Sequence, residues 1–255
     1  MISATLMGGL GNQLFQLAAA HGLAIQSGKE TVIQTQTAGN SAHSRNDYKH
    51  TIFKNWRQVD TGFDYIFKEA EHDACVHTVI AVPETSAHFH MHGYFQHEKY
   101  VADCRAEFID RLSLPADVPH LRQSCFIHIR KGDYVGNAVH DIDLCSRYLP
   151  RAMSLLRALH PGLSFLVFSD DIAFCKTMAL LQQDDVLFYE EADEVASLVQ
   201  MSKCGLGGIC WNSSFSWWGA YMNENPDKVV VFPSKWFNNS WKVDIQLTNS
   251  IIIKT

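Results

Sequence analysis

Short apolar runs alternate with helical patterns along the second half of this 255-residue chain. Each run has the length of a buried strand. Such alternation requires a parallel sheet covered by helices. The predicted strands are 125–129, 163–168, 186–189, 208–211 and 229–232, and the predicted helices are 144–159, 172–181, 193–203 and 215–223.

The first half opens as a strand–helix–strand unit and then becomes harder to assign. Its predicted elements are a strand at 2–7, a helix at 14–26, a strand at 31–36, a strand at 88–94 and a helix at 98–112. The region 37–85 has a weak pattern, with one candidate strand at 75–82. The fold class predicted for the whole chain is therefore α/β with mainly parallel sheets.

A segment with two prolines, 113–123, separates the two halves and has the composition of a linker. The predicted domains are 1–118 and 119–255. A chain of 255 residues is long enough for two small domains of this kind.

Composition excludes several classes of protein. The formal net charge of −6, without a block of like charges, argues against a nucleic-acid partner. No apolar run reaches membrane-spanning length, and the N-terminus lacks the basic start and apolar core of a signal peptide. Seven cysteines without a CxxC pair fit reduced thiols. These features predict a cytoplasmic protein without a transmembrane segment, and they leave its oligomeric state open.

The stretch CFIHIRKGDY, 125–134, runs from an apolar strand directly into charged residues. Strand alternation puts His128 and Arg130 on one face, and Gly132 allows a sharp turn before Asp133. A guanidinium, an imidazole and a carboxylate then meet at the carboxyl end of a buried strand, where open α/β sheets bind ligands. This arrangement predicts an anion site, and a structural salt-bridge cluster is the alternative.

A glycine-rich turn, GGLGNQ at 8–13, joins the first strand to the first helix. Free N–H groups at a helix N-terminus favour an anion. The spacing does not match the dinucleotide-binding fingerprint, because Leu14 stands where the third glycine belongs. A plain tight turn is the alternative.

Two more segments lie where strands end and helices begin. FSDD ends in Asp170 and Asp171, which are suited to bind a ribose, a base edge or a metal, or to cap the next helix. WNSSFSWWG, 211–219, offers serine hydroxyls and backbone N–H groups to a phosphate. Its serines are equally suited to serve as ordinary helix caps.

Taken together, these segments resemble the α-1,2-fucosyltransferases of glycosyltransferase family 11 over nearly the whole chain. The matching segments are MGGLGNQLFQLA, GYFQHEKY, HIRKGDY, FSDD and NSSFSWWGAYMN. The resemblance implies two facing Rossmann-like domains, the GT-B arrangement. Related α-1,6- and protein O-fucosyltransferases share the HxRxGD core, so the linkage depends on GGLGNQ and NSSFSWWGA.

The resemblance also implies an activity: inverting transfer of L-fucose from GDP-fucose, without a metal or other cofactor, to a galactose-type hydroxyl of an oligosaccharide or glycan. A fucosyltransferase of different linkage and a catalytically silent nucleotide-sugar binder are the alternatives. The first domain would be the acceptor side, and the second would bind the nucleotide sugar.

Residue roles follow from the same resemblance. Arg130 would clamp the diphosphate, and His128 would contact the nucleotide or orient the site. The residues expected to bind substrates are Gly9, Gly11, Asn12, Gln13, Asp170, Asp171, Asn212, Ser213, Ser214 and Ser216.

The acceptor hydroxyl must lose a proton, and a carboxylate near the clamp is the natural general base. Asp133 is the candidate. A salt bridge that orients Arg130 is the alternative role for this residue. A late proton transfer that needs no dedicated base is also open.

Two patterns suggest metals but are expected to have no metal role. Asp141 and Asp143 form a DxD sequence in a loop, and hard cations need further oxygen ligands. His88, His90 and His92 share one strand face, as three zinc ligands would. The family resemblance gives neither group a metal to bind.

Overall fold

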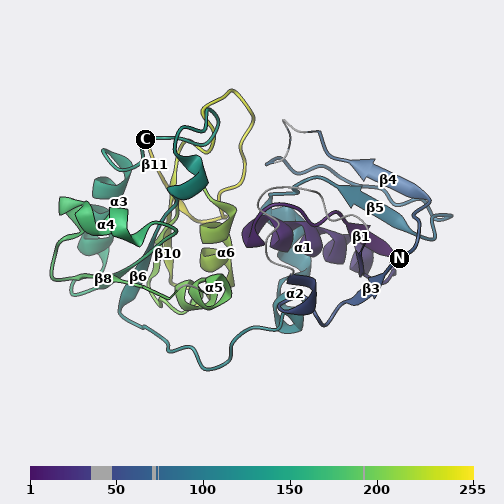
Figure 1. Cartoon of the computed structure of the whole chain (residues 1–255), viewed down its shortest axis with the longest axis horizontal. Coiled ribbons are helices and arrows are strands. Elements are labelled where there is room, and N and C mark those ends of the chain that lie inside the picture. The colour runs from purple at the N-terminus through teal and green to yellow at the C-terminus, as the bar shows by residue number, and fades with distance from the viewer. Residues whose placement is uncertain (36–47, 71–72, 74, 192) are drawn as a thin grey trace. The chain divides into compact units, whose positions relative to one another are not determined.

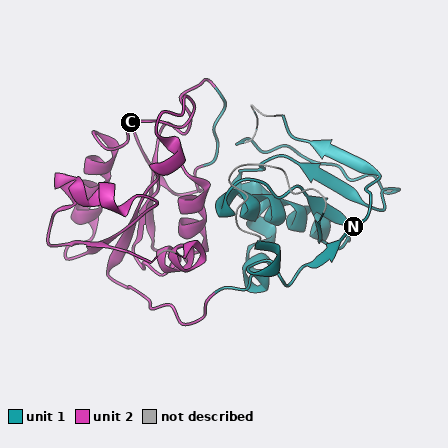
Figure 2. Ribbon diagram, viewed as in Figure 1, with its two compact units in different colours: residues 1–114, 241–245 teal, residues 115–240, 246–255 magenta. Residues whose placement is uncertain are grey.

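The computed structural model describes residues 1–35, 48–70, 73, 75–191 and 193–255. The chain forms two compact units (Figure 2). Unit 1 comprises residues 1–114 and 241–245, and unit 2 comprises residues 115–240 and 246–255. The boundary falls inside the proline-containing segment, and a short stretch near the C-terminus returns to unit 1. The acceptor and nucleotide roles assigned to the two halves stay predictions.

Unit 2 is built on a parallel sheet whose strand order is β11-β10-β9-β6-β7-β8 (Figure 1). Its strands are β6 (Ser124–Ile129), β7 (Ser164–Ser169), β8 (Val186–Phe188), β9 (Gly207–Ile209), β10 (Val229–Pro233) and β11 (Ile251–Ile253). Its helices are α3 (Tyr148–Leu159), α4 (Ile172–Thr177), α5 (Glu194–Ser202) and α6 (Ser214–Met222). The predicted alternation is confirmed, and β11 is a strand that the sequence pattern did not reveal.

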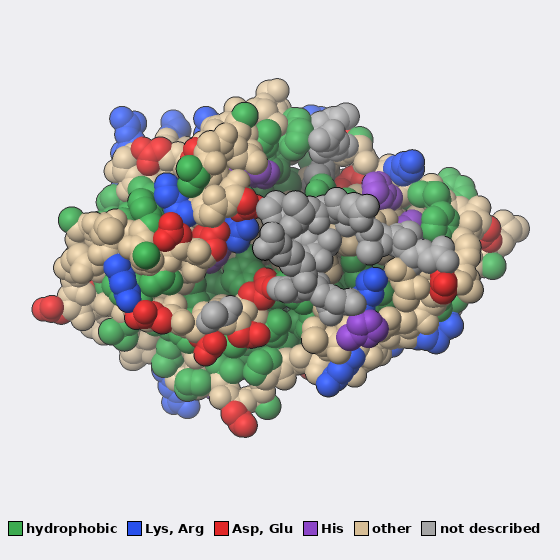
Figure 3. All heavy atoms as spheres, viewed as in Figure 1, with side chains coloured by type: hydrophobic (Ala, Val, Ile, Leu, Met, Phe, Trp, Pro, Cys, Tyr) green, Lys and Arg blue, Asp and Glu red, His purple; other side chains and the backbone are tan. Residues whose placement is uncertain are grey.

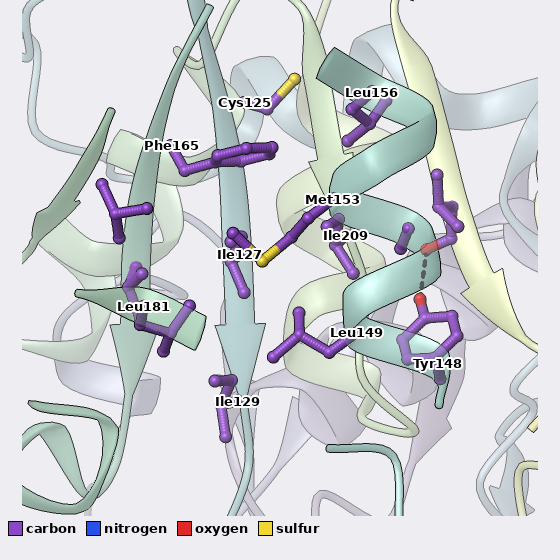
Figure 4. Packing of buried hydrophobic residues seen from close by; sticks show 14 of the residues in the cluster. Cys125, Ile127, Ile129, Tyr148, Leu149, Met153, Leu156, Phe165, Leu181 and Ile209 are labelled. Carbon is purple, nitrogen blue, oxygen red and sulfur yellow. Dashed lines mark hydrogen bonds between the residues drawn. The ribbon is translucent and has the colours of Figure 1, made fainter. Parts of the chain in front are cut away.

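Strand alternation decides what each face of β6 contacts. Ile127 and Ile129 point into an apolar core with Leu149 and Met153 of α3 (Figure 4). The opposite face carries His128, whose ring centroid lies 5.5 Å from that of Phe215 in α6. The core therefore fixes one face of β6 and directs His128 away from it.

Unit 1 contains the parallel sheet β1-β5-β4 and the parallel pair β2-β3. The strands are β1 (Ile2–Ala4), β2 (Val32–Gln34), β3 (Arg57–Val59), β4 (Tyr65–Lys68) and β5 (Phe89–His92). Helix α1 (Leu10–Gln26) packs Ala19, Ala20 and Ala24 on the apolar face that Phe89 and Met91 present. The other face of β1 and β5 is polar, because Ser3 and the alternate histidines lie on it.

Several predictions for unit 1 were wrong. Residues 75–82 form no strand, and β3 and β4 lie in the weakly patterned region instead. The predicted helix at 98–112 is divided into two short 3-10 turns and α2 (Arg105–Arg111). The first turn brings the Tyr100 carbonyl against Gly22 of α1, where a Cβ would clash, so tertiary packing overrides the helical pattern. Residues 36–47, which include the end of the predicted strand 31–36, lie outside the described residues.

None of the helices among the described residues is long and apolar enough to cross a membrane. On the face drawn in Figure 3, the acidic and basic side chains of the described residues are interspersed.

A partly buried carboxylate holds the turn that follows β5. Glu69 Oε2 accepts hydrogen bonds from the backbone N–H groups of Tyr94 (2.7 Å) and Phe95 (2.9 Å). Phe95 has a left-handed backbone, with φ of 52°. Burial raises the pKa of Glu69 to about 7. Glu69 therefore fixes a strained turn but is more easily protonated than an ordinary glutamate.

This pKa predicts how stability depends on pH. The unfolded carboxyl ionises near pH 4.5, whereas the folded one ionises near 7, so its contribution to the unfolding free energy falls as pH rises through this window. Glu69→Gln removes this dependence. We expect the melting temperature of the variant, relative to wild type, to rise between pH 4.5 and 7 and to level off above. The exposed residue Glu84 gives the control Glu84→Gln; an equal trend in that control would contradict the assignment.

Candidate functional site

Arg130 follows β6 directly and is held by two carboxylates. Its Nε and Nη2 lie 2.9 and 2.7 Å from Asp133 Oδ1, and Nε lies 3.2 Å from Asp170 Oδ2. Burial opposes the charge of Arg130, but Asp170 and then Asp133 outweigh it and raise its pKa. About a third of the side chain is exposed, at 32%. We call these three residues the Arg130 cluster.

The cluster depends on the register between β6 and β7. Ile129 pairs with Ser169, so the next residue of each strand, Arg130 and Asp170, reaches the same carboxyl edge of the sheet. Asp170 Oδ1 also accepts a hydrogen bond from the Lys131 N–H at 2.8 Å. A Cβ on residue 132 would meet the Asp170 carboxylate, so any residue other than glycine would have to displace that side chain. Asp170 thus fixes both the guanidinium and the turn after it.

The remaining edge of the guanidinium is available to a ligand. Within the part of the chain that the structure describes, the hydrogen bond and the closest ion-pair contacts of Arg130 involve Nε and Nη2 rather than Nη1. A guanidinium with an unused donor edge suits a carboxylate or phosphate oxygen. The structure therefore brings Arg130, Asp133 and Asp170 together as a cationic centre with a fixed orientation.

His128 lies next to the cluster and is only 3% exposed. Burial, and then the charge of Arg130, lower its pKa to about 3. The imidazole is therefore neutral at physiological pH. Its Nδ1 is buried without a hydrogen-bond partner among the described residues.

The turn between β9 and α6 carries the other predicted phosphate ligands. Ser213 is the N-cap of α6 and accepts from the Phe215 N–H at 3.4 Å. Ser214 is the first residue of the helix and is partly exposed. The fully buried Ser216 hydroxyl accepts from the Trp211 N–H (3.2 Å) and lies 3.0 Å from the carbonyl of Ser213. Ser216 thus holds the turn, and substrate contacts of the three serines stay predictions.

Asn212 ties this turn to the loop after β6. Its side-chain amide donates to the backbone carbonyls of His140 and Trp236, both at 3.1 Å. The backbone carbonyl of Asn212 accepts a hydrogen bond from the Tyr134 hydroxyl at 3.0 Å. Asn212 Oδ1 is buried without a hydrogen bond to any described residue, as is His140 Nδ1. Buried polar atoms are usually satisfied, so these two atoms can each take a hydrogen bond from a ligand or a water molecule.

A pocket of about 240 Å³ lies beside the cluster in unit 2. Its lining includes Arg130, Tyr134, His140, Asp141, Phe174 and Trp211. The Tyr134 and His140 rings stack at 4.8 Å, which gives the pocket an aromatic wall. The sequence analysis gave Tyr134, His140 and Phe174 no site role, since single aromatic residues carry no pattern that marks a pocket wall.

The carboxylates of the DxD sequence are engaged in their own loop. Asp141 accepts from the Gly136 N–H at 2.8 Å, and Asp143 accepts from the Ser146 hydroxyl at 2.6 Å. Among the residues that the structure describes, no three His, Cys, Asp or Glu side chains are placed to hold a metal ion. Independence from metal stays a prediction.

The glycine-rich turn belongs to unit 1, where Gly9 is the N-cap of α1. Gly11, Asn12 and Gln13 lie in the first helical turn, because α1 begins at Leu10, four residues earlier than predicted. Gln13 donates to the Gly8 carbonyl at 2.9 Å, and Asn12 Oδ1 accepts from Gln96 at 2.7 Å.

Gln96 comes from the GYFQHEKY segment, so two separate sequence motifs meet in unit 1. Gln16, which the sequence analysis missed, holds both the N–H and the carbonyl of Met7. Gln16 lies one turn after Gln13 on α1. This helical spacing predicts that the two side chains lie on the same side of the helix, and it would have identified Gln16 as a residue that holds the turn.

Comparisons with known proteins agree with this architecture. The model of glycosyl transferase family 11 matches residues 1–253. An alpha-1,2-colitosyltransferase of Escherichia coli is 26% identical over an alignment 278 residues long, gaps included, that covers 93% of this chain and 92% of that protein. A galactoside 2-alpha-L-fucosyltransferase of Caenorhabditis elegans is 32% identical over 115 residues, 43% of this chain and 32% of that protein.

Solved structures of the fucosyltransferase NodZ from Bradyrhizobium share the fold. One has a TM-score of 0.57 at 12% identity and covers 86% of this chain and 92% of that one. Another structure, of NodZ alpha-1,6-fucosyltransferase co-crystallised with GDP, has a TM-score of 0.56 at 11% identity. It covers 86% of this chain and 91% of that one. The GT-B-like α/β fold class, with mainly parallel sheets, is confirmed.

The two adjacent acids of FSDD have different roles in the structure. Asp170 joins the Arg130 cluster, whereas Asp171 caps α4 by accepting from the Phe174 N–H at 2.9 Å. We expect Asp171→Ala to lower the unfolding free energy by about 1 kcal/mol, because an N-cap hydrogen bond is lost. Asp171→Asn should recover most of this, since asparagine also caps helices. Urea unfolding followed by circular dichroism measures both, and an unchanged stability in Asp171→Ala would contradict the capping role.

Proposed function

Because the chain belongs to glycosyl transferase family 11, we propose that it transfers L-fucose from GDP-fucose to a galactose-type hydroxyl of a glycan. The proposed reaction forms an α-1,2 linkage with inversion at the fucose anomeric carbon. The observation that carries the proposal is the Arg130 cluster, which presents an unused guanidinium edge at the carboxyl end of β6. Two relatives with α-1,2 or 2-alpha activity in their names, and NodZ structures with GDP and GDP-fucose, support the choice of donor and linkage.

Arg130 would stabilise the charge that develops on the leaving diphosphate. As the bond from C1 of fucose to the phosphate oxygen breaks, negative charge grows on GDP. The guanidinium is already oriented by Asp133 and Asp170, so little reorganisation is needed when that charge appears. Backbone N–H groups at the start of α6 would add to this stabilisation, which is why we propose a reaction without a metal.

Asp133 fits an orienting role better than that of general base. Both Nε and Nη2 of Arg130 contact its Oδ1, and accepting a proton would neutralise the partner of that ion pair. His128 is neutral and buried, so we propose that it contacts the nucleotide through its unpartnered Nδ1.

Transfer of colitose is a second candidate. Colitose is L-fucose without the hydroxyl at C3, and the relative that matches 93% of this chain is a colitosyltransferase. A silent nucleotide-sugar binder is the third. We also propose a cytoplasmic location, which the seven free cysteines support.

A transfer assay separates these candidates. The protein is incubated with GDP-fucose, GDP-colitose or UDP-galactose and a panel of galactose-terminated disaccharides, with and without EDTA. Mass spectrometry and NMR of the products then report the sugar and the linkage. We expect an α-1,2-fucosylated product whose yield is unaffected by EDTA. Faster transfer from GDP-colitose would favour the second candidate, and GDP binding without transfer would favour the third. Activity that EDTA abolishes and manganese restores would contradict independence from metal.

Arg130→Ala tests the clamp. Removing one charge-stabilising donor typically lowers turnover by 10²-fold or more, and we expect a loss of about that size here. Arg130→Lys should recover little, because an ammonium lacks the planar fork.

Arg122→Ala is the matched control, since Arg122 is an exposed arginine of unit 2 that does not line the pocket. A native circular dichroism spectrum must accompany each variant. Turnover of Arg130→Ala within a few-fold of wild type would contradict the assignment.

A further inference from the structure

Strand β4 lies at the edge of the unit 1 sheet and exposes apolar side chains there. In the strand order β1-β5-β4, it has a strand neighbour on one side only among the described residues (Figure 1). Tyr65 and Ile66 of β4 are 47% and 44% exposed. An unpaired edge with large apolar side chains is suited to pair with a strand of another chain.

The hydrogen bonds to β5 decide which backbone groups of β4 face outward. The Asp64 N–H donates to the His88 carbonyl at 3.1 Å. Successive residues of a strand direct their N–H and C=O groups to opposite sides, so the backbone groups of Ile66 also face β5. The backbone groups of Tyr65 and Phe67 therefore face away from the sheet. They offer two donors and two acceptors to an added antiparallel strand.

The sequence around Ile66 is complementary to itself. Asp64 and Lys68 lie two residues before and two residues after Ile66, and both are exposed. When two copies of β4 pair antiparallel around a two-fold axis at Ile66, Asp64 of each copy lies opposite Lys68 of the other. The same register puts Tyr65 opposite Phe67. These are the residues whose backbone groups face outward, so each such pair exchanges two hydrogen bonds.

Other registers lack this pairing of charges. Parallel pairing in register puts Lys68 beside Lys68 and Asp64 beside Asp64, which is unfavourable. A shift of the antiparallel register by one or two residues, in either direction, places an uncharged residue opposite Lys68. The charges of β4 therefore favour one two-fold arrangement over its alternatives.

Asp64 carries its charge at physiological pH. Hydrogen bonds from the Ser86 hydroxyl and then from the Ala87 N–H, both at 2.7 Å, lower the pKa of Asp64 to about 2. Each carboxylate oxygen has two lone pairs and can accept a further donor. Because Asp64 also holds the segment before β5, Lys68 is the member of the pair that can be changed with less effect on the fold.

Strand β11, an exposed edge in unit 2, does not have this complementarity. Ile252 at its centre is 55% exposed. Antiparallel pairing of two copies of β11 around Ile252 would put Ser250 opposite Lys254, without an opposite charge. Exposure of an edge strand is thus not specific by itself, and β11 provides a comparison for β4.

We propose that β4 is a self-association surface through which two copies of this chain join their unit 1 sheets edge to edge. The partner is a second copy because the residues of β4 complement those of the same strand. A two-fold contact uses the β4 edge of both copies, so the assembly stops at a dimer. The paired segment is short, and small interfaces form weak complexes, so the dissociation constant is expected in the micromolar range. This inference goes beyond the proposed transfer reaction and does not depend on it.

Sedimentation velocity of the wild-type protein over a range of concentrations measures the association. We expect a reversible equilibrium between monomer and dimer. A protein that stays monomeric up to about 1 mM, where the association free energy would be weaker than about −4 kcal/mol, would overturn the proposal.

Charge variants assign the contact to β4. Ile66→Lys places two ammonium groups opposite each other at the two-fold axis, and it should raise the dissociation constant by about tenfold or more. Lys68→Glu places like charges opposite each other at both ends and should also weaken the dimer. Ile252→Lys makes the same change as Ile66→Lys at the exposed edge strand of unit 2 and should leave the dissociation constant unchanged.

Melting temperatures and circular dichroism check that each variant is folded. An unchanged dissociation constant in Ile66→Lys, or an equal loss of dimer in Ile252→Lys, would contradict the assignment to β4.

Disulfide cross-linking tests the register and does not depend on charge. The two Ile66 residues form a non-hydrogen-bonded pair, with Cα atoms about 4.5 Å apart, which is within the reach of a disulfide. Ile66→Cys should therefore give a covalent dimer under mild oxidation. Lys68→Cys is the control, because its two copies would lie about 13 Å apart along the strands and should not cross-link.

Wild-type protein, which has seven free cysteines, gives the background of this experiment. Cross-linking of Lys68→Cys in place of Ile66→Cys, or no covalent dimer above the background in Ile66→Cys, would refute the two-fold pairing of β4.

Discussion

The ion pair between Arg130 and Asp170 joins two neighbouring strands of unit 2 at the edge where a ligand would bind. It forms because β6 and β7 are parallel and in register, so residues that follow Ile129 and Ser169 emerge side by side. Asp170 also accepts from the Lys131 backbone, and Gly132 leaves room for its carboxylate beside the turn. The orientation of the guanidinium, the shape of the turn and the wall of the pocket all depend on this contact.

The ion pair orients the Arg130 guanidinium but contributes little to the stability of the fold. The Arg130, Asp133 and Asp170 side chains are each between about a quarter and a third exposed, and ion pairs with such access to water contribute little to folding. Two carboxylates around one guanidinium also leave it poised to exchange part of its contacts for an incoming anion. A diphosphate carries more charge than either carboxylate and would therefore be a strong partner for the unused edge.

Unit 1 uses buried polar groups in a different way. Its sheet has an apolar face against α1 and a polar face on which His88, His90 and His92 hydrogen-bond to Ser3 and Thr5. Burying the imidazoles of His88 and His90 costs free energy unless each nitrogen is paired, and both nitrogens of each ring have a partner.

Much of unit 2 was predictable from the sequence, because its strands are continuous apolar runs and its helices follow at regular intervals. Arg130 and His128 became candidates because a polar and charged cluster interrupts and follows the apolar run of β6. Unit 1 was less predictable: β3 and β4 are short and largely exposed, so they carry no apolar pattern. The helix expected at 98–112 was wrong because packing of Tyr100 on Gly22 is a tertiary contact that local periodicity does not encode.

The different roles of Asp170 and Asp171 could be distinguished only in the structure, because the sequence made both equally suited to bind a ligand or to cap the next helix. The sequence predicted that His88, His90 and His92 share one strand face, but their serine and threonine partners lie 85 or more residues away in the sequence. Only the parallel register of β1 and β5 brings these side chains together.

A crystal structure of the protein with bound GDP tests the central claim most directly. The account predicts that oxygens of the diphosphate lie within hydrogen-bonding distance of the Arg130 guanidinium, with Asp170 still bonded to the Lys131 N–H. A diphosphate bound elsewhere, with Arg130 contacting only Asp133 and Asp170, would contradict it.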